Sequence, residues 1–308
     1  MKSRTNKRTA PVKLRVGGRS ITVSHSDKLL FPKSKITKAE LIAYYQKIAP
    51  VMIPKVKDRP LVMVRYPHGI ADEGFFQKNV ASYFPDWIET VSVARQSQPR
   101  AQMVLCNNAA TLVYLANQDC ITPHIWLSSV DSLRCPDRMI FDLDPGEHVT
   151  FAAIMEAAKL LRALLEKLCL KPFVMTTGSR GLHVVVPLKP ELPFAKVRAV
   201  ARTIAASLVN LYPEHYTIEH RIARRRGKIF IDYLRNAYAQ TGVAPYAVRA
   251  IEGAPVATPL RWEELTSDLT SQRYTIHNIF TLLRKRKDPW ARMKASARSL
   301  KRLTARLP

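Results

Sequence analysis

The chain has 308 residues, of which 47% are hydrophobic and 24% are charged, a composition typical of globular proteins and not of disordered ones. Its 49 Lys and Arg residues outnumber 24 acidic residues, so the formal net charge is +25, which favours nucleic acid over an acidic membrane as a polyanionic partner. No run approaches the roughly 18 apolar residues of a membrane-spanning helix, and the basic N-terminus lacks a secretory signal's apolar stretch. We therefore expect a cytoplasmic protein that associates with the nucleoid and not with a membrane.

The positive charge is concentrated at the two ends of the chain. Residues 1–26 contain seven Lys or Arg and no acid, and residues 284–308 contain ten, with Asp288 as the single acid. We predict a basic N-terminal arm over 1–26, a folded domain over 27–290 and a basic C-terminal tail over 291–308. Binding of a polyanion is the favoured role of the two ends, and solubilising tails are the simpler alternative.

Apolar periodicity and capping signals predict helices and strands along the whole chain. The expected elements are a helix over 37–49, a strand over 61–65, a strand over 138–143, a helix over about 150–169, a strand–turn–strand unit over 172–188, a helix over 194–211 and a strand over 228–234. The first helix starts at a capping box formed by Thr37 and Glu40. The order from 138 to 234 predicts an α+β fold with a ferredoxin-like or RNA-recognition-motif-like sheet, against which the N-terminal third must pack.

Acidic residues stand in two of these strands. Asp142 and Asp144 are separated by one residue, so both would project from the same face if the strand continues through Asp144. Two such close negative charges repel each other, and a divalent cation with hard oxygen ligands resolves that conflict. Asp232 lies between apolar neighbours in the strand KIFIDYL, where an acid is unusual unless it is paired or binds metal. Three carboxylates on neighbouring strands would suit two-metal phosphoryl or nucleotidyl transfer.

An ordinary turn is the alternative reading of the first two acids, because D-x-D before Pro-Gly commonly caps a turn. A turn does not explain Asp232. The segment Thr176 to His183, TTGSRGLH, has its own two readings. Its backbone N–H groups could cradle phosphate with help from Arg180, or it could be a plain hairpin turn.

Further cations and aromatics also allow two interpretations. Arg235 and Arg249 could pair with triphosphate oxygens, although a surface ion pair is the commoner fate of a single Arg. His124 has apolar neighbours, which favours a core histidine. Phe75 and Phe76 lie beside a cation in a predicted loop, where they could stack on bases, but core packing is favoured without other information.

Taken together, the motifs resemble a known family. The chain is similar to the polymerase domain of bacterial DNA ligase D, a branch of the archaeo-eukaryotic primase superfamily. The matching segments, in the family's order, are DKLLFPKSKITKAELIAYY (27–45), RPLVMVRYPHGIADEGFFQK (59–78), PHIWLS (123–128), MIFDLDPG (139–146), TTGSRGLHVVVPL (176–188), KIFIDYLRNA (228–237), TGVAPYAVRA (241–250) and GAPVATPLRWEEL (253–265). The resemblance implies a primase-polymerase fold over residues 27–290.

The resemblance also implies roles for individual residues. It makes Asp142, Asp144 and Asp232 the metal-binding and catalytic acids. It assigns the nucleotide site to His124, Thr177, Arg180, His183, Arg235 and Arg249. Thr177 replaces the family's usual Ser and Arg180 its usual Lys, so the hydroxyl and the charge are kept. Lys28 and Lys38 match the residues that grip the downstream 5′-phosphate, and Phe75 and Phe76 match the aromatics near the templating base.

The implied activity is template-dependent addition of nucleotides, preferentially ribonucleotides, to 3′-hydroxyl ends. It would act at gaps and double-strand breaks in non-homologous end joining, with two Mn²⁺ or Mg²⁺ ions and NTP or dNTP as substrate. Expected partners are DNA ends, gapped DNA with a 5′-phosphate, Ku and an ATP-dependent DNA ligase. The alternatives are a non-catalytic module that holds DNA ends, which explains the charge equally well, and a metal-dependent nuclease, which uses similar acids.

Overall fold

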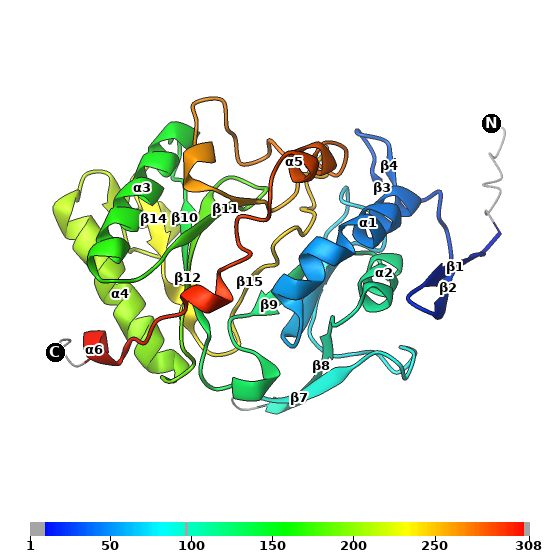
Figure 1. The fold of residues 1–308 in the computed structure, drawn as a ribbon. Helices are drawn as coiled ribbons and strands as arrows, with labels where there is room; N and C mark the ends of the chain where they lie inside the picture. The colour runs from blue at the N-terminus through cyan, green and yellow to red at the C-terminus, as the bar shows by residue number, and fades with distance from the viewer. Residues whose placement is uncertain (1–9, 96–97, 305–308) are drawn as a thin grey trace.

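Two β-sheets stand side by side, each with helices on one face (Figure 1). The computed structural model describes residues 10–95 and 98–304. The N-terminal sheet contains, in spatial order, β15 (Thr241–Val243), β9 (Cys120–Trp126), β5 (Pro60–Arg65), β8 (Gln98–Leu105) and β7 (Thr90–Arg95), and β6 (Phe75–Gln77) also pairs with β5. The C-terminal sheet contains β13 (Tyr216–Thr217), β14 (Ile229–Asp232), β10 (Arg138–Asp144), β12 (Leu182–Pro187), β11 (Phe173–Thr176) and β16 (Pro259–Leu260). The mixed α+β fold class is confirmed.

The C-terminal sheet has the predicted ferredoxin-like organisation. Its helices are α3 (Phe151–Lys167) and α4 (Phe194–Leu211), which follow β10 and β12 respectively. The crossover through α3 leaves room for β12 between β10 and β11, and the neighbours β14, β10, β12 and β11 are all antiparallel. Only the short strand β13 interrupts the expected order before β14. The structure therefore confirms the strand and helix order predicted for this part of the chain.

The two faces of strand β10 have different partners. Met139, Phe141 and Leu143 are fully buried in a core cluster with the apolar sides of α3 and α4. Ile140 belongs instead to the core cluster that includes the N-terminal half. Because side chains alternate along a strand, Asp142 lies on the face of Ile140, the face that looks across toward the N-terminal sheet.

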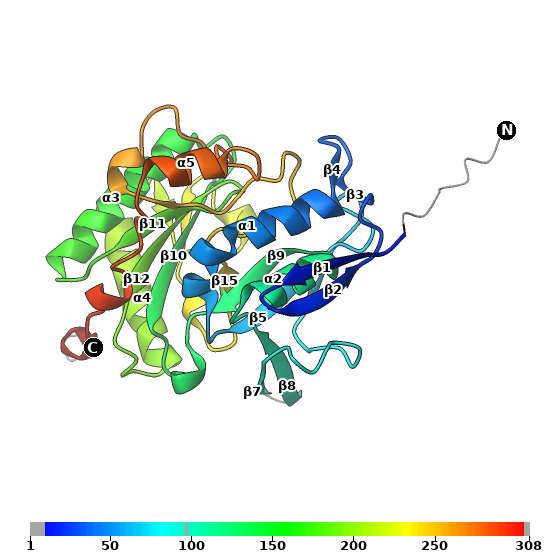
Figure 2. The same ribbon diagram turned by 45° about the vertical axis from the view of Figure 1, so that its right-hand side comes forward.

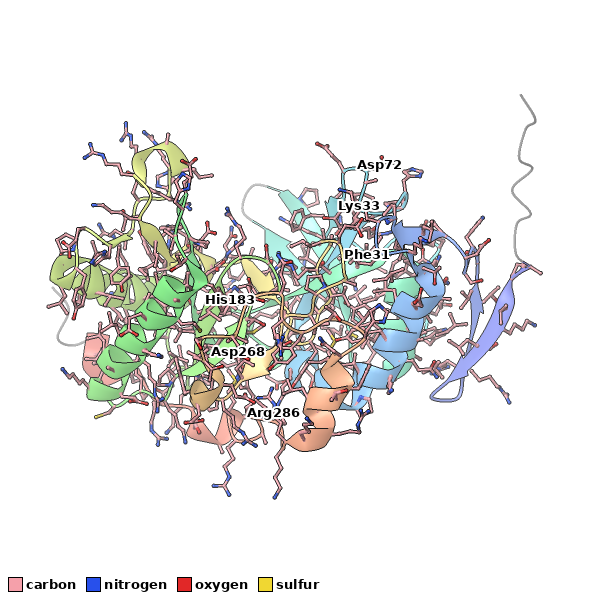
Figure 3. All side chains as sticks on the ribbon, turned by 90° about the horizontal axis from the view of Figure 1, so that it is seen from above. Phe31, Lys33, Asp72, His183, Asp268 and Arg286 are labelled. Carbon is pink, nitrogen blue, oxygen red and sulfur yellow. The ribbon has the colours of Figure 1, made fainter. Side chains whose placement is uncertain are left out.

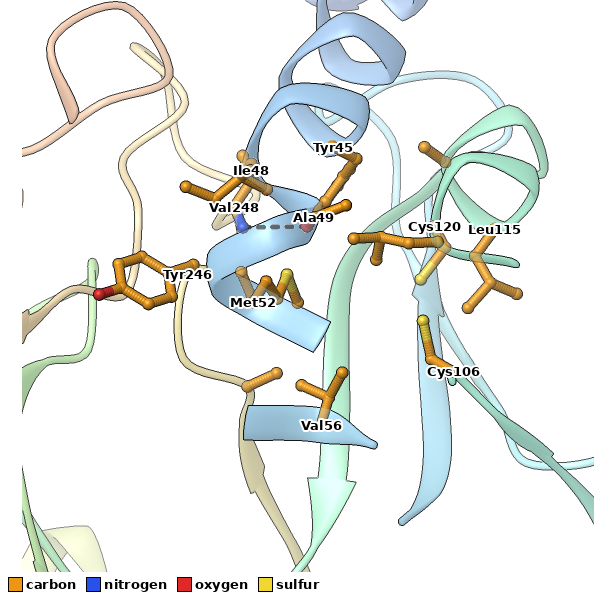
Figure 4. Packing of buried hydrophobic residues seen from close by; sticks show 14 of the residues in the cluster. Tyr45, Ile48, Ala49, Met52, Val56, Cys106, Leu115, Cys120, Tyr246 and Val248 are labelled. Carbon is orange, nitrogen blue, oxygen red and sulfur yellow. Dashed lines mark hydrogen bonds between the residues drawn. The ribbon is translucent and has the colours of Figure 1, made fainter. Parts of the chain in front are cut away.

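Helices α1 (Lys38–Val56) and α2 (Ala109–Asn117) cover the N-terminal sheet. The capping box of α1 is present, since the backbone N–H of Glu40 donates to Thr37 and that of Thr37 to the Glu40 carboxylate. The helix continues beyond the expected end at residue 49, through Pro50 and Pro54. Its buried face packs onto the sheet in Figure 4, where the Tyr45 hydroxyl accepts a 3.0 Å hydrogen bond from the Val248 N–H.

Both ends of the chain carry structure within the described residues. The hairpin β1 (Val12–Val16) and β2 (Arg19–Val23) falls inside the predicted N-terminal arm and lies beside α2, away from the body of the sheets (Figure 2). Residues 1–9 and 305–308 of the predicted ends lie outside the described residues. The remaining short elements are β3 (Leu29–Phe31), β4 (Ile36–Thr37), η1 (Val130–Ser132), η2 (Ile222–Arg224), η3 (Leu234–Asn236), η4 (Trp262–Glu264), α5 (Ile279–Lys285), η5 (Lys294–Ser296) and α6 (Lys301–Thr304).

The segment after α5 crosses the seam between the two sheets. Trp290 is 2% exposed and belongs to the core cluster that contains residues of both sheets, and its indole N–H donates to the carbonyl of Val174 in β11 at 3.2 Å. Its ring also lies edge-to-face with Phe173.

Within residues 10–95 and 98–304, none of the helices combines the length and apolar character needed to span a bilayer.

Candidate nucleotidyl-transfer site

The three predicted acids lie together at one end of the C-terminal sheet. β10 does continue through Asp144, and antiparallel pairing with β14 places Asp142 directly opposite Asp232. Asp232 is the last residue of β14 and not a mid-strand residue as expected, because η3 begins two residues later. Its carboxylate therefore accepts a 2.7 Å hydrogen bond from the N–H of Leu234, which fixes the side chain at the strand end.

Basic side chains surround the Asp142 carboxylate. His183 faces it across the β10–β12 pair, with its Nε2 3.5 Å from an Asp142 oxygen, and Arg235 reaches the same oxygen at 3.5 Å. Burial by itself would raise the pKa of Asp142, but the charges of His183, Arg235 and Arg249 outweigh it and lower this pKa to about 2. Asp142 is thus held ionised at neutral pH.

Asp144 is held by two arginines. Arg180 contacts one carboxylate oxygen at 3.0 Å and Arg225 contacts the other at 2.8 Å. Sequence reasoning missed Arg225, which is 9% exposed, stacks over the Phe230 ring and has an Nε without a hydrogen-bond partner. The sequence indicates Arg225 only through the run of three arginines just before β14. Such a run is equally typical of a solvated cluster of charges.

A divalent cation is consistent with the chemistry of these donors. Asp142 and Asp232 present hard oxygen ligands on neighbouring strands, and burial together with the negative charge of Asp142 raises the pKa of Asp232. That repulsion is the kind that a cation relieves. Among the described residues, no three His, Cys, Asp or Glu side chains already converge in the way a bound ion requires. In this structure, the positive charge beside Asp144 comes from Arg180 and Arg225.

The raised pKa of Asp232 predicts the effect of Asp232→Asn on metal-free protein. A carboxyl whose folded pKa exceeds its unfolded value stabilises the fold below the unfolded pKa, and this contribution is lost as the pH rises through the folded pKa. At pH 7 the ionised Asp232 therefore costs stability. Asn keeps the acceptor for the N–H of Leu234, so this variant should unfold a few degrees higher than the unmodified protein in thermal scans at pH 7. An equal or lower unfolding temperature contradicts this account.

The turn between β11 and β12 is organised by one hydroxyl. The Oγ1 of Thr177 accepts hydrogen bonds from the N–H groups of Ser179 and Gly181, each at 3.2 Å. Gly178 has φ +67°, and a Cβ there would lie 2.9 Å from the Arg249 side chain. Arg249 donates to the Thr177 carbonyl at 2.8 Å, so the turn and this arginine form one wall.

Residues from both sheets line a cleft of about 270 Å³ between them. Seen from above, His183 lies between the two halves of the molecule (Figure 3). The predicted nucleotide and metal residues that line the cleft are Asp142, Asp144, Asp232, His124, Thr177, Arg180, His183, Arg235 and Arg249. The arginines around these carboxylates give the cleft positive groups that can attract an anion.

His124 enters the cleft from β9 of the N-terminal sheet. His124 lines the cleft, as does Val243, its partner across the strand pair. The initial core interpretation of this histidine is therefore wrong. Burial, followed by the charges of Arg249 and Arg235, lowers the pKa of His124 to about 3, so the ring is neutral at physiological pH. Its Nδ1 is buried without a hydrogen-bond partner.

Of the two predicted stacking aromatics, Phe76 lies next to this histidine and Phe75 lies beside Arg65. Phe75 and Phe76 are 45% and 63% exposed, which excludes the core-packing alternative. They belong to strand β6 and not to a loop, because β6 pairs with β5. The Phe76 ring stands edge-to-face with His124 at a centroid distance of 5.9 Å. The exposed Phe76 ring therefore lies beside a residue that lines the cleft.

Lys28 and Lys38 lie near each other in the N-terminal half. The backbone N–H of Lys38 donates to the carbonyl of Lys28 at 2.8 Å, and both ammonium groups approach Asp119, at 2.6 Å and 3.5 Å respectively. Sequence analysis did not identify Asp119, which sits in the polar segment between α2 and β9.

Comparison with known proteins supports the resemblance seen in the sequence. Residues 37–290 match the family described as LigD, primase-polymerase domain. The chain belongs to this family. The chain is similar to the multifunctional non-homologous end joining protein LigD of Mycolicibacterium smegmatis, with 35% identity over 80% of the chain and 32% of that protein. It is also similar to the bifunctional non-homologous end joining protein LigD of Bacillus subtilis, with 32% identity over 86% of the chain and 42% of that protein.

A solved LigD structure has the same fold. The polymerase domain from Mycobacterium tuberculosis ligase D in complex with DNA superposes with a TM-score of 0.84 and 29% identity, covering 90% of this chain and 99% of that one. The chain thus matches that polymerase domain over almost its whole length, while it spans less than half the length of the LigD relatives named above.

Proposed function

We propose that this LigD primase-polymerase chain is a template-dependent nucleotidyltransferase that adds nucleotides, preferentially ribonucleotides, to 3′-hydroxyl ends at DNA gaps and double-strand breaks during non-homologous end joining. The observation that carries the proposal is the pairing of Asp142 with Asp232 across β10 and β14, in a cleft lined by arginines. A surface that only holds DNA has no need to direct carboxylates toward phosphates.

Asp142, Asp144 and Asp232 would hold two divalent ions, Mn²⁺ or Mg²⁺. When bound, such ions lower the pKa of the primer hydroxyl and neutralise charge on the triphosphate. The low pKa of Asp142 keeps this residue ready as a ligand without loss of a proton. Asp144 would have to exchange at least one of its arginine contacts for this role.

The arginines that line the cleft would bind the incoming nucleotide. Arg235, Arg249 and Arg180 supply planar guanidinium groups that match phosphate oxygens, and they would neutralise charge that develops during transfer. His183 would contact the triphosphate from β12, and Thr177 shapes the turn, whose residues Ser179 and Gly181 also line the cleft. His124 is neutral and offers a hydrogen bond to the sugar without adding charge.

DNA contacts would come from the N-terminal half. Lys28 and Lys38 would grip the 5′-phosphate of the downstream strand, and the exposed Phe75 and Phe76 would stack near the templating base. Phosphate contacts carry no base information, so little sequence specificity and a steep loss of binding with salt are expected. Ku and an ATP-dependent DNA ligase are the partners that we propose for the intact pathway.

A primer extension assay tests this function. The substrate is a primer–template with a gap and a recessed 5′-phosphate, incubated with NTPs or dNTPs and Mn²⁺. Lengthening of the primer supports the proposal, and faster lengthening with NTPs supports the ribonucleotide preference. Shortening of the primer would instead indicate a nuclease, and a mobility shift without chemistry would indicate a DNA-end-binding module.

Replacing Lys28 and Lys38 together by Ala should remove the preference for phosphorylated gaps. Both ammonium groups would be lost from the same place, so a 5′-phosphate and a 5′-hydroxyl should bind within about twofold of each other. The measurement is the affinity ratio for the two gapped substrates, with Lys33→Ala as a control for loss of general positive charge. A ratio equal to that of the unmodified protein refutes the lysine assignment.

A further inference from the structure

A buried carboxylate lies where the two lysines meet. The Oδ2 of Asp119 is 2.6 Å from the ammonium of Lys28, which also donates to the carbonyl of Pro67 at 2.9 Å. The Oδ1 is 3.5 Å from the ammonium of Lys38 and makes no hydrogen bond. The Asp119 residue is 8% exposed. The Asp119 carboxylate is thus an anion that lies between two ammonium groups, as a bound phosphate would.

The backbone at Asp119 is in the left-handed region. Its φ is +60°, a conformation that favours Gly and that Asp adopts at some cost. Its carbonyl accepts the N–H of Tyr66 at 2.9 Å, so this conformation is held by the residue that follows β5. The Asp119 side chain therefore lies between the two lysines because of a backbone conformation that Gly would adopt more easily.

Asp119 compensates the positive charge of the two lysines beside it. Lys38 is only 3% exposed, and burial lowers its pKa, while Asp119 acts in the opposite direction. A third cation, Arg65, is occupied by neutral acceptors, namely the Gln118 carbonyl at 2.6 Å and the Gln77 side chain at 2.7 Å. Asp119 is thus the carboxylate that the structure places in contact with both lysines.

We propose that Asp119 is an internal occupant of the 5′-phosphate site, which an incoming phosphate must displace from Lys28 and Lys38. This inference rests on the proposed function, because it takes the two lysines as the phosphate-binding pair. A terminal phosphate carries about −1.5 to −2 charge and three acceptor oxygens, so it can replace the single carboxylate. Asp119 weakens the grip on every anion at this position and so sets the strength of 5′-phosphate selection.

Asp119→Asn tests this inference by removing the charge while keeping the shape. The variant should bind gapped DNA with a 5′-phosphate about tenfold more tightly than the unmodified chain, because the repulsion by one close negative charge is lost. Binding of the 5′-hydroxyl gap should change by less than about threefold. The readout is fluorescence anisotropy without nucleotide or metal, so the result does not depend on catalysis. An unchanged or smaller phosphate-to-hydroxyl affinity ratio overturns the inference.

Two variants guard against a folding artefact. Asp119→Gly also removes the carboxylate and suits the +60° backbone, so it should raise the ratio in the same way. Asp58→Asn is the matched control, since Asp58 has φ +59° and its carboxylate bonds with Asn107, away from the lysines. It should leave the ratio unchanged.

If the ratio rises in the Asp119 variants while no protein extends a primer, the polymerase proposal fails and this inference stands.

Discussion

Replacing Asp142 and Asp144 together by Asn is expected to abolish nucleotide addition, with a loss of about 10³-fold or more in the single-turnover rate. Both side chains project from the same face of β10, and Asn keeps their size while removing two negative charges. DNA binding should stay equal or become slightly tighter, because the cleft becomes more positive. The measurements are primer extension on gapped DNA with Mn²⁺ and affinity for the same DNA.

The control for this variant is Asp131→Asn. Asp131 is an exposed acid in η1 and lines a different pocket together with Arg138, at the opposite end of β10 from the cleft. It should extend primers at the normal rate. Retained extension in the double Asn variant would refute the assignment of the catalytic acids.

Gly181→Ala is expected to destabilise the protein and reduce nucleotide addition strongly. A Cβ at Gly181 would lie 2.1 Å from the carbonyl oxygen of Leu143, which sits between the two acids of β10. Backbone atoms cannot turn away as a side chain can, so β10 and the start of β12 must move apart. Overpacking of this kind typically costs about 1–3 kcal/mol. Chemical denaturation and single-turnover extension measure the two effects.

Gly242→Ala provides the comparison for this prediction. Its added Cβ would meet only side-chain ends, the Cδ1 of Ile140 at 3.1 Å and the Cε1 of His183 at 3.9 Å. A small shift of Ile140 would relieve the first contact, so the free energy of unfolding should change much less than in Gly181→Ala. Equal stability of the two variants would show that β10 tolerates displacement at this point.

The C-terminal sheet was predictable because its elements carry local signals. The α4 range matches the predicted 194–211 completely, since its apolar period is unbroken. The D-x-D spacing predicted that Asp142 and Asp144 share a face, and β10 confirms it. The end of α1 was not predicted, because prolines normally end a helix, whereas here the burial of Met52 and Val56 holds the last turns.

The contributions of distant segments were not predictable without the resemblance. His124 reaches the cleft because β9 pairs with β15, more than 100 residues later in the chain, and no local pattern encodes that pairing. Phe75 and Phe76 form a strand only because β5 provides a partner. Asp119 depends on a left-handed backbone, and Arg225 on a loop that brings it back to Asp144, so neither contact is visible in sequence spacing.

The Trp290 contact has a mechanical consequence for the cleft. Its ring is buried in a core cluster that contains residues of both sheets, and its indole N–H donates to β11, so separating the two halves would expose a large aromatic surface to water. The Trp290 contact therefore opposes a wider separation of the two sheets that line the cleft. For the proposed activity, we therefore expect nucleotide selection to depend on loops that line the cleft, such as the one carrying Arg225, more than on closure of one half onto the other.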